Sequence, residues 1–377
     1  MTDIYLIRHC EAEGNLYRRV QGSYNGLPTA RGRKQIDALA ERFRNVHIDA
    51  LYSSDLTRAM ETAGAVSRFH PLELRIDPRL REVDMGVWEN VPWGNVARDD
   101  PEQMDYFSNT PEKWHVAGAE SFEDLRRRIT EAVLDIAAEN EGKTVAIVSH
   151  GMAIRTFLSG ITGLSARETG HGDNTAVALL HAEGGCVTAE YFNDNSHLDE
   201  KTSTFAQQSW WREASAGGDR HNLALLPLDP EKDRELYIEC YGSAWEFAHR
   251  TRFGFEGGGY WESALHHLED DPRCVIKAYA GEQFAGLIDL SLTRGRRESA
   301  GWISLCYVIP ELRGKNDSIQ LIGHAVTLFR EKGFDRMRLH VAENNGRAIG
   351  FYEKTGFVRV GEDTGMFGRL LTMEMSI

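Results

Sequence analysis

Two short apolar runs, each ended by a histidine, constrain the fold of this chain more than any other feature. Residues 4–7 (Ile-Tyr-Leu-Ile) lie just before His9, and residues 145–148 (Val-Ala-Ile-Val) lie just before His150. A brief run rich in β-branched residues that stops at a polar turn is typical of a buried parallel strand. Because open parallel sheets place their chemistry beyond the carboxyl ends of the strands, we expect both histidines to share one pocket.

The length and the pattern of the chain predict two α/β domains. A chain of 377 residues exceeds what one hydrophobic core usually holds. Up to residue 198, short apolar runs alternate with helical patterns, as in a sheet that is layered by helices. The predicted helices are 31–44, 56–69, 122–139 and 153–161, and two further strands are 51–53 and 176–180.

A change in composition separates the two predicted domains. Residues 199–220 are polar and lack both the helical and the strand period, which predicts a linker between domains at 1–198 and 221–377. Trp210 and Trp211 are unusual in a linker, and we expect them to dock on one of the domains. The second domain has predicted strands at 223–226, 275–279, 284–292 and 302–308 and a helix at 319–332. Short turns such as Gly281-Glu282 make consecutive strands antiparallel.

Charge and cysteine content exclude several classes of protein. The net charge of −14 opposes a general surface for nucleic acid or for an anionic membrane. The five cysteines are scattered without paired spacing, which favours reduced thiols over a disulfide framework or a zinc site. The first residues run directly into a strand without a signal-like or membrane-spanning stretch. We therefore expect a cytoplasmic protein that binds neither nucleic acid nor a membrane.

Residues around the first histidine are suited to phosphoryl transfer, which needs a nucleophile, cations around the phosphate and a proton for the leaving group. His9 becomes a nucleophile through one ring nitrogen if a backbone carbonyl holds the other as a donor. Arg8 is suited to bind two phosphate oxygens, and Arg58 would lie in the first turn of a helix. Glu82 is the candidate acid. Taken alone, Arg58 is typical of a solvated helix and Glu82 of a surface ion pair with Arg81, but the combination favours catalysis.

Five motifs follow one another along residues 1 to about 198. They are Leu6-Ile7-Arg8-His9 with Asn15; Gln21-Gly22 with Thr29 and Gly32; residues 53–59 with Glu61-Thr62; Leu80-Arg81-Glu82 with Gly86 and Trp88-Glu89; and Val148-Ser149-His150-Gly151. In this order they resemble the histidine phosphatase family, whose members include cofactor-dependent phosphoglycerate mutases and many small-molecule phosphatases.

The resemblance implies a phosphoglycerate mutase-like three-layer α/β/α sandwich that acts on a small phosphorylated substrate. It implies that His9 is the nucleophile that is phosphorylated and that Glu82 is first the proton donor and then the base. The implied phosphate and substrate contacts are Arg8, Arg58 and His150, with Asn15, Gln21 and Gly22. The resemblance implies neither a metal nor a cofactor for this reaction.

The chain departs from the family pattern at several positions. Cys10 stands where the family usually has glycine, Ala12 removes one hydroxyl contact, and Asn25 replaces an acidic residue. Beside cations, the thiol of Cys10 could acquire a low pKa and become a redox switch, but we favour a passive small residue. Residues 87–117 form a shorter segment than the corresponding insertion of phosphoglycerate mutases. This difference favours hydrolysis over a mutase reaction.

A second resemblance covers the chain from about His221 onward. Residues 341–357 match the spacing of Val, Asn, Ala, Phe-Tyr, Lys and Gly-Phe in the GNAT acetyltransferase superfamily. The resemblance implies an α/β domain with a mainly antiparallel sheet, an acetyl-CoA cofactor and an amine acceptor. It implies that Tyr352 protonates the leaving thiolate and that strand 305–308 splays open to bind the pantetheine arm. The implied cofactor contacts are Cys306, Val308, Arg313, Gly314, Lys315, Asn316, Ser318 and Asn345.

The loop that should bind the pyrophosphate is altered. Asn316 and Ser318 stand where the family has small residues, and Asp317 adds a negative charge. Asn316 tolerates left-handed backbone angles, and Ser318 is suited to cap a helix, so the loop could still close around a phosphate. The alternatives are an active N-acetyltransferase and a domain without catalysis that binds a ligand or forms a homodimer.

Overall fold

The computed structural model describes residues 1–208 and 222–377 and divides into two compact units, Met1–Asp219 and Arg220–Ile377. We describe each unit by itself. Trp210 and Trp211, expected to dock on a domain, lie outside the described residues. Along the described parts of the chain, no helix has the length and apolar character needed to cross a membrane.

A six-stranded sheet forms the centre of the first unit, with strand order β3-β2-β4-β1-β5-β6. The strands are β1 (Thr2–Arg8), β2 (Ala50–Ser53), β3 (Leu74–Ile76), β4 (Thr144–Ser149), β5 (Val177–Glu183) and β6 (Cys186–Asp194). β1 and β4 are parallel neighbours, and Arg8 is paired with Ser149 at their ends. His9 and His150 therefore leave the sheet side by side at the same edge.

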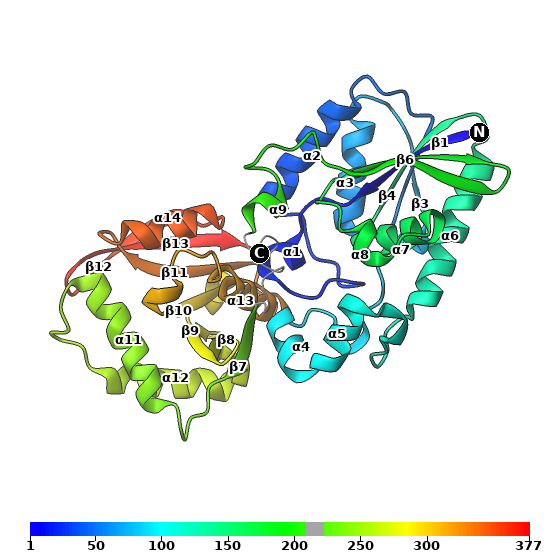
Figure 1. Cartoon of the computed structure of the whole chain (residues 1–377). Coiled ribbons are helices and arrows are strands. Elements are labelled where there is room, and N and C mark those ends of the chain that lie inside the picture. Colours follow the sequence, from blue (N-terminus) through cyan, green and yellow to red (C-terminus); the bar gives the residue numbers. More distant parts are fainter. Residues whose placement is uncertain (209–221) are drawn as a thin grey trace. The chain divides into compact units, whose positions relative to one another are not determined.

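Helices cover both faces of this sheet (Figure 1). The helices are α1 (Glu13–Tyr17), α2 (Ala30–Phe43), α3 (Thr57–Ser67), α4 (Trp93–Asp99), α5 (Pro101–Asn109), α6 (Phe122–Glu139), α7 (Gly151–Thr162), α8 (Ala166–Thr169) and α9 (Thr204–Gln207). One core joins the sheet to α6 and α7, and a second core joins its other face to α2 and α3. The expected three-layer α/β/α sandwich is confirmed.

The segment after β6 is attached to the first unit by hydrogen bonds. Its residues 199–208 were expected to be the start of a linker, but they include α9. Thr204 is buried, and its hydroxyl lies 3.1 Å from a carboxylate oxygen of Glu11 and 2.9 Å from the side-chain nitrogen of Gln35. The hydroxyl of Ser203 donates to Asp173 at 2.6 Å. The polar composition of this stretch thus serves a buried hydrogen-bond network, which composition alone cannot distinguish from a solvated linker.

A seven-stranded sheet in the order β12-β13-β11-β10-β9-β8-β7 forms the second unit. Its strands are β7 (Leu223–Pro227), β8 (Val275–Ala280), β9 (Gln283–Ser291), β10 (Ala300–Val308), β11 (Arg336–Ala342), β12 (Val358–Gly365) and β13 (Gly368–Ser376). The one parallel pair in the sheet is β10 with β11, and the other neighbours are antiparallel. The mainly antiparallel sheet that the sequence predicted is confirmed.

Helices also lie on this second sheet. They are α11 (Arg234–His249), α12 (Gly257–Asp270), α13 (Ile319–Glu331) and α14 (Gly346–Lys354). α11 and α12 contact β8, β9 and β10, while α13 contacts β9, β10 and β11. α13 packs closely because Gly301 of β10 has no side chain: a Cβ there would lie 2.3 Å from the ring of Phe329.

Candidate functional sites

His9 follows β1 and is almost fully buried, with 4% of its surface exposed. Its Nδ1 lies 2.6 Å from the carbonyl oxygen of Cys10, so Nδ1 carries the proton and donates it to that carbonyl. This tautomer leaves the lone pair on Nε2. Burial and the charges of Arg58 and Arg8 lower the pKa of His9 well below its usual value of 6.5. The ring is therefore neutral at pH 7, as a nucleophile must be.

His150 lies beside His9, and the centroids of the two rings are 5.0 Å apart. Its Nε2 lies 2.7 Å from the hydroxyl oxygen of Ser54. Among the described residues, the proton of this hydroxyl has no other acceptor, so the hydroxyl donates to Nε2 and the ring proton of His150 lies on Nδ1. Burial lowers the pKa of His150 as well. Nδ1 is buried and has no hydrogen-bond partner in the described parts of the chain.

Two arginines, the half-buried Arg8 and the fully buried Arg58, complete the cationic side of this site. Arg58, in the first turn of α3, is fully buried and donates from its two terminal nitrogens to the carbonyls of Gly22 and Tyr24, both at 2.8 Å. Burial lowers its pKa to about 10, so it stays charged at pH 7. Arg8 donates to the carbonyl of Gly172 at 2.6 Å. Within residues 1–208 and 222–377, neither Nε has an acceptor.

Three buried N–H donors from different segments thus lack an acceptor among the described residues: Nε of Arg8, Nε of Arg58 and Nδ1 of His150. A buried donor without a partner costs about 1–3 kcal/mol, so such groups are rare unless a ligand satisfies them. An anion with several acceptor oxygens, such as a phosphate group, satisfies all three.

The carboxylate of Glu82 lies at the start of α7. It accepts hydrogen bonds from the backbone N–H groups of Val83 (2.9 Å), Met152 (2.9 Å) and Ala153 (3.0 Å). Its charge raises the pKa of both Arg8 and Arg58, opposing the effect of desolvation, so it lies close to them. The structure therefore brings Glu82 together with the histidines and arginines that the sequence singled out.

Asn15 and Gln21 were expected to contact substrate, but their side-chain oxygens have internal partners. Oδ1 of Asn15 accepts from the backbone N–H of Ala12 at 3.1 Å and from the side chain of Asn174 at 3.4 Å. Oε1 of Gln21 accepts from the backbone N–H of Gly14 at 2.6 Å. These oxygens hold the loop after His9 in place, which leaves the amide nitrogens for contact with substrate.

Glu89 holds the loop that contains Gly22 in place, a role that its sequence motif did not reveal. Its carboxylate accepts four backbone N–H groups, those of Gly22 (3.2 Å), Ser23 (2.7 Å), Tyr24 (2.9 Å) and Met85 (2.9 Å). The carbonyls of this loop hold Arg58, so Glu89 positions the arginine indirectly. A Cβ at Gly22 would lie 2.4 Å from Glu89, so only glycine fits there. The motif Trp88-Glu89 was the feature of the sequence that could have pointed to this role of Glu89.

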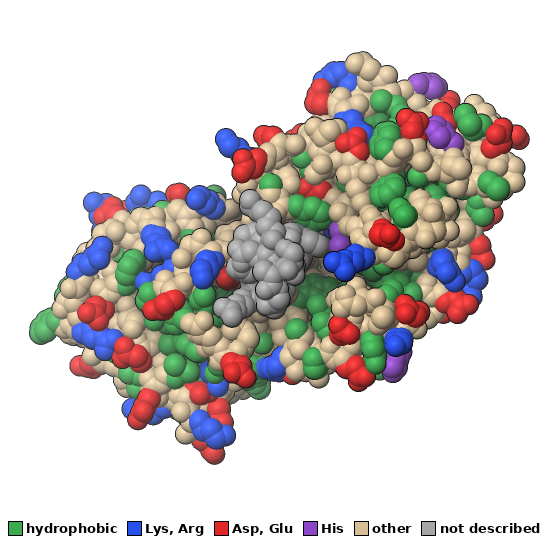
Figure 2. Space-filling view, viewed as in Figure 1, with side chains coloured by type: hydrophobic (Ala, Val, Ile, Leu, Met, Phe, Trp, Pro, Cys, Tyr) green, Lys and Arg blue, Asp and Glu red, His purple; other side chains and the backbone are tan. Residues whose placement is uncertain are grey.

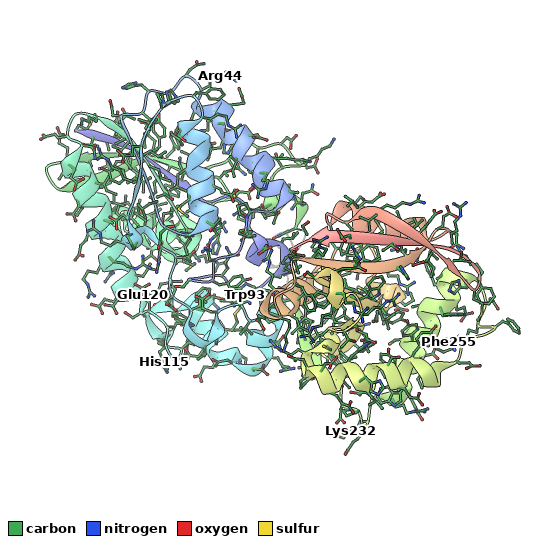
Figure 3. The ribbon with its side chains drawn as sticks, turned by 180° about the vertical axis from the view of Figure 1, so that it is seen from behind. Arg44, Trp93, His115, Glu120, Lys232 and Phe255 are labelled. Carbon is green, nitrogen blue, oxygen red and sulfur yellow. The ribbon has the colours of Figure 1, made fainter. Side chains whose placement is uncertain are left out.

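Arg128 of α6 supports the loop that carries Glu82. It donates to the carbonyls of Arg79 (2.7 Å), Arg81 (2.7 Å) and Glu82 (2.8 Å), and it pairs with the carboxylate of Glu120 at 2.6 Å. Sequence reasoning missed this residue because an arginine in an amphipathic helix usually faces solvent. Figure 3 labels Glu120, which precedes α6.

Residues 87–117, which are short relative to the mutase insertion, fold around aromatic side chains. They contain α4 and α5, and the rings of Trp88, Trp93, Phe107 and Trp114 lie within 6.5 Å of one another in successive pairs. Trp93 and His115 mark this region in Figure 3. The segment is therefore a small folded layer and not an open loop.

Cys10 does not have the low pKa of a redox switch, which was the less favoured alternative for this residue. The side chain is fully buried, and burial raises its pKa to about 12. The loss of hydration outweighs the nearby cations, so the thiol is protonated and inert at neutral pH. The passive alternative is the one that this environment favours.

The second unit contains a cleft of about 520 Å³ where β10 separates from β11. The two strands pair only from Ala300–Ile303 to Arg336–Leu339, and the rest of β10 pairs with β9 alone. The expected splay of strand 305–308 is therefore present. Of the predicted cofactor contacts, Cys306, Val308, Arg313, Gly314, Asn316, Ser318 and Asn345 line the cleft, as does Tyr352. Lys315 is exposed and is not among the lining residues.

Tyr352 and Cys306 face each other in this cleft and share a side-chain hydrogen bond. Burial raises the pKa of the Tyr352 hydroxyl well above 10 and the pKa of Cys306 to about 12. Tyr352 therefore carries its proton at pH 7. The neighbouring carbonyl of Val308 accepts from Nε of Arg313 at 2.8 Å, so one of the two lone pairs of this oxygen is engaged within the chain.

The loop before α13 contains two left-handed residues, Gly314 (φ 87°) and Asn316 (φ 69°). Asn316 thus adopts the backbone angles that favour glycine, as we expected. Ser318 does not form the expected side-chain cap of α13. Asn345 is the N-cap of α14, where its side chain accepts from the N–H of Ala348 at 3.2 Å.

Comparison with known proteins agrees with this geometry. Residues 4–195 match the model of the histidine phosphatase superfamily (branch 1). The chain belongs to this superfamily. Residues 234–357 match the acetyltransferase (GNAT) family, so the chain joins a histidine phosphatase domain to a GNAT domain. The first domain is an enzyme domain of the α/β class.

Similar proteins match the first domain. "Probable phosphoglycerate mutase GpmB" of Enterobacter sp. (strain 638) is 34% identical over 166 residues, which are 44% of this chain and 77% of that protein. The protein of the same name from Yersinia pestis (strain Pestoides F) is 37% identical over 167 residues, with the same coverage. The structure of Bacillus stearothermophilus YhfR is 31% identical, with a TM-score of 0.51, and the match covers 53% of this chain and 100% of that one.

Proposed function

We propose that the first domain hydrolyses a small phosphomonoester through a phosphohistidine at His9. The observation that carries this proposal is the pair of neutral histidines, 5.0 Å apart, together with buried N–H donors of Arg8, Arg58 and His150 that lack acceptors among the described residues. A phosphate group satisfies these donors and brings its phosphorus to the Nε2 lone pair of His9.

In the first step, Nε2 of His9 attacks phosphorus, and the bond from phosphorus to the ester oxygen breaks. The arginines and His150 stabilise the negative charge on the phosphate oxygens. Glu82, in its protonated form, gives its proton to the departing alkoxide. In the second step, Glu82 takes a proton from water, the water oxygen attacks the phosphorus, and the bond from phosphorus to Nε2 breaks. Inorganic phosphate leaves and the neutral histidine is restored.

A mutase is the alternative for this site, and the relatives named as probable phosphoglycerate mutases support it. In a mutase, a second hydroxyl of the substrate takes the place of water and receives the phosphoryl group. The short segment 87–117 favours hydrolysis. Incubation with 2- and 3-phosphoglycerate and with a panel of phosphorylated sugars and amino acids distinguishes the two, because only hydrolysis releases inorganic phosphate in amounts equal to the substrate consumed.

Two variants test the roles of the residues. His9→Ala should abolish both phosphate release and the acid-labile phosphoenzyme; an active variant contradicts the covalent mechanism. Glu82→Gln should reduce kcat on alkyl phosphates by about 10²–10⁴-fold, while nitrophenyl phosphate, whose leaving group needs no proton, should lose much less. Equal losses on both substrates contradict the assignment of Glu82 as the acid. Glu131→Gln, an exposed carboxylate of α6, is the matched control.

For the second domain we propose acetyl-CoA-dependent transfer to an amine. The residues present fit this cofactor: β10 is splayed at residues 305–308, the adjacent cleft has the size of a ligand site, and protonated Tyr352 lines it. Acetyl-CoA supplies the acyl group as a thioester. Tyr352 would protonate the leaving thiolate, and the edge of β10 would bind the pantetheine arm.

A domain that only binds a ligand or forms a homodimer is the alternative. The altered loop favours it, because Asn316 and Ser318 replace small residues. Calorimetric titration of the whole chain with acetyl-CoA separates the hypotheses. Micromolar binding supports the enzyme, and Tyr352→Phe should then lower kcat with little change in the affinity for acetyl-CoA. Absence of binding contradicts the acetyltransferase proposal.

A further inference from the structure

The carbonyls of the loop at residues 313–318 accept the first backbone N–H groups of α13. Helix N-termini bind phosphate because their first N–H groups have no acceptor within the helix. At α13, however, the N–H of Ile319 donates to Asn316 (3.5 Å), that of Gln320 to Asp317 (3.1 Å) and that of Leu321 to Ser318 (3.1 Å). The first three donors of the helix are therefore turned back onto the loop and are poorly placed to receive an anion.

Asp317 adds a negative charge to the loop but does not line the cleft. It is buried, with 6% of its surface exposed, and it lies between the two positions where the family has small residues. It is not among the described residues that line the cleft, so the charge that an anion would meet there comes from the lining side chains.

Arg347, at the start of α14, stands next to this loop. A Cβ at Gly314 would lie 3.3 Å from a terminal guanidinium nitrogen of Arg347, so the guanidinium lies close to the backbone of the loop, and both residues line the cleft. The side chain is exposed, and no carboxylate within the described residues forms an ion pair with it. Its fork of N–H donors is therefore free to bind two phosphate oxygens.

The lining of the cleft as a whole is cationic. It includes Arg313, Arg347 and Lys354, whereas no aspartate or glutamate is among the described residues that line it. This is unusual in a chain with a net charge of −14. Figure 2 shows Lys and Arg side chains over the part of the surface formed by α14. Such local reversal of charge favours a ligand with several negative charges.

We propose that Arg347 binds the pyrophosphate of the CoA ligand and supplies donors in place of the first N–H groups of α13, which the carbonyls of the 313–318 loop engage. The proposal rests on the proposed function of the second domain. Gly314 makes the arrangement feasible, because the absence of a side chain leaves room for the guanidinium above the loop. Arg313 also lines the cleft, and the hydrogen bond from its Nε to the carbonyl of Val308 holds its guanidinium close to the end of β10.

The test is calorimetric titration of the full chain with CoA and with 3′-dephospho-CoA, which keeps the pyrophosphate but lacks the 3′-phosphate. Arg347→Ala should raise the Kd of both ligands at least tenfold, which corresponds to about 1.4 kcal/mol. Arg347→Lys, which keeps the charge without the fork, should recover part of the affinity. The control is Arg297→Ala, which removes an exposed cation outside the cleft and should leave both Kd values unchanged.

The outcomes separate this inference from the function on which it rests. If the unaltered chain binds neither ligand, the acetyl-CoA proposal fails and the inference fails with it. If the chain binds both and Arg347→Ala binds them equally well, only the inference is overturned. If the variant loses affinity for CoA but not for 3′-dephospho-CoA, Arg347 contacts the 3′-phosphate, and the assignment to the pyrophosphate is overturned.

Discussion

Replacing Glu89 by glutamine tests how the loop after Gln21 positions Arg58. Each carboxylate oxygen of Glu89 accepts two backbone N–H groups. Glutamine keeps one oxygen and replaces the other with a donor, so two N–H groups lose their acceptor. Each loss costs about 1–3 kcal/mol, and because Glu89 is half-buried we expect about 2–4 kcal/mol less free energy of unfolding.

The same change should reduce catalysis, although Glu89 is not proposed to touch substrate. The loop carbonyls of Gly22 and Tyr24 hold the guanidinium of Arg58, and a shifted loop weakens its charge-assisted bonds to phosphate. We expect kcat/KM to fall about 10–100-fold. Urea unfolding and steady-state kinetics measure the two effects, with Glu131→Gln as the control. A Glu89→Gln variant with unaltered stability and kcat/KM would refute the reasoning.

Three further predictions concern pH, reactivity and packing. Burial lowers the pKa of His197 to about 4 in the folded protein. Because this histidine takes up a proton below pH 6.5 in the unfolded chain but only near pH 4 in the folded one, the free energy of unfolding should decrease as the pH falls from 6.5 to 4. The decrease is at most about 1.4 kcal/mol per pH unit. Urea unfolding at pH 7, 6 and 5 should give a shallower slope for His197→Asn. Iodoacetamide at pH 8 should modify the exposed Cys186 but not Cys10, as detected by mass spectrometry; early labelling of Cys10 in folded protein contradicts its raised pKa. Gly32→Ala should lower stability by about 1–3 kcal/mol, because its Cβ would lie 2.1 Å from the carbonyl oxygen of Glu11; an unchanged urea midpoint contradicts this.

Much of the fold could be predicted because its signals are local. The helix predicted at 122–139 is found at Phe122–Glu139, and the strand predicted at 284–292 is found at Gln283–Ser291. Both follow from the spacing of apolar residues within one element. Short or mostly exposed elements, such as β3 (Leu74–Ile76) and β12 (Val358–Gly365), lack that spacing and were missed.

Local signals also decided which functional residues the sequence singled out. His9, Arg58 and Glu82 were identified from motifs, because each lies at the end of a predictable element or in a recognisable loop. Glu89 and Arg128 were not assigned roles, because their partners lie far away along the chain or are backbone groups, which no side-chain pattern reveals.

The sequence by itself determined the two α/β domains, their longer apolar strands and helices, and the residue types needed for phosphoryl transfer. Tertiary structure alone decided that Arg58 is buried and held by backbone carbonyls, that β10 separates from β11 after Ile303, and that α13 turns its first N–H groups onto the loop. The physical reason is the separation along the sequence over which each kind of interaction acts. Periodicity and turn propensity act between neighbours in sequence, whereas burial, charge compensation and hydrogen bonding depend on which distant segments the packed chain brings together.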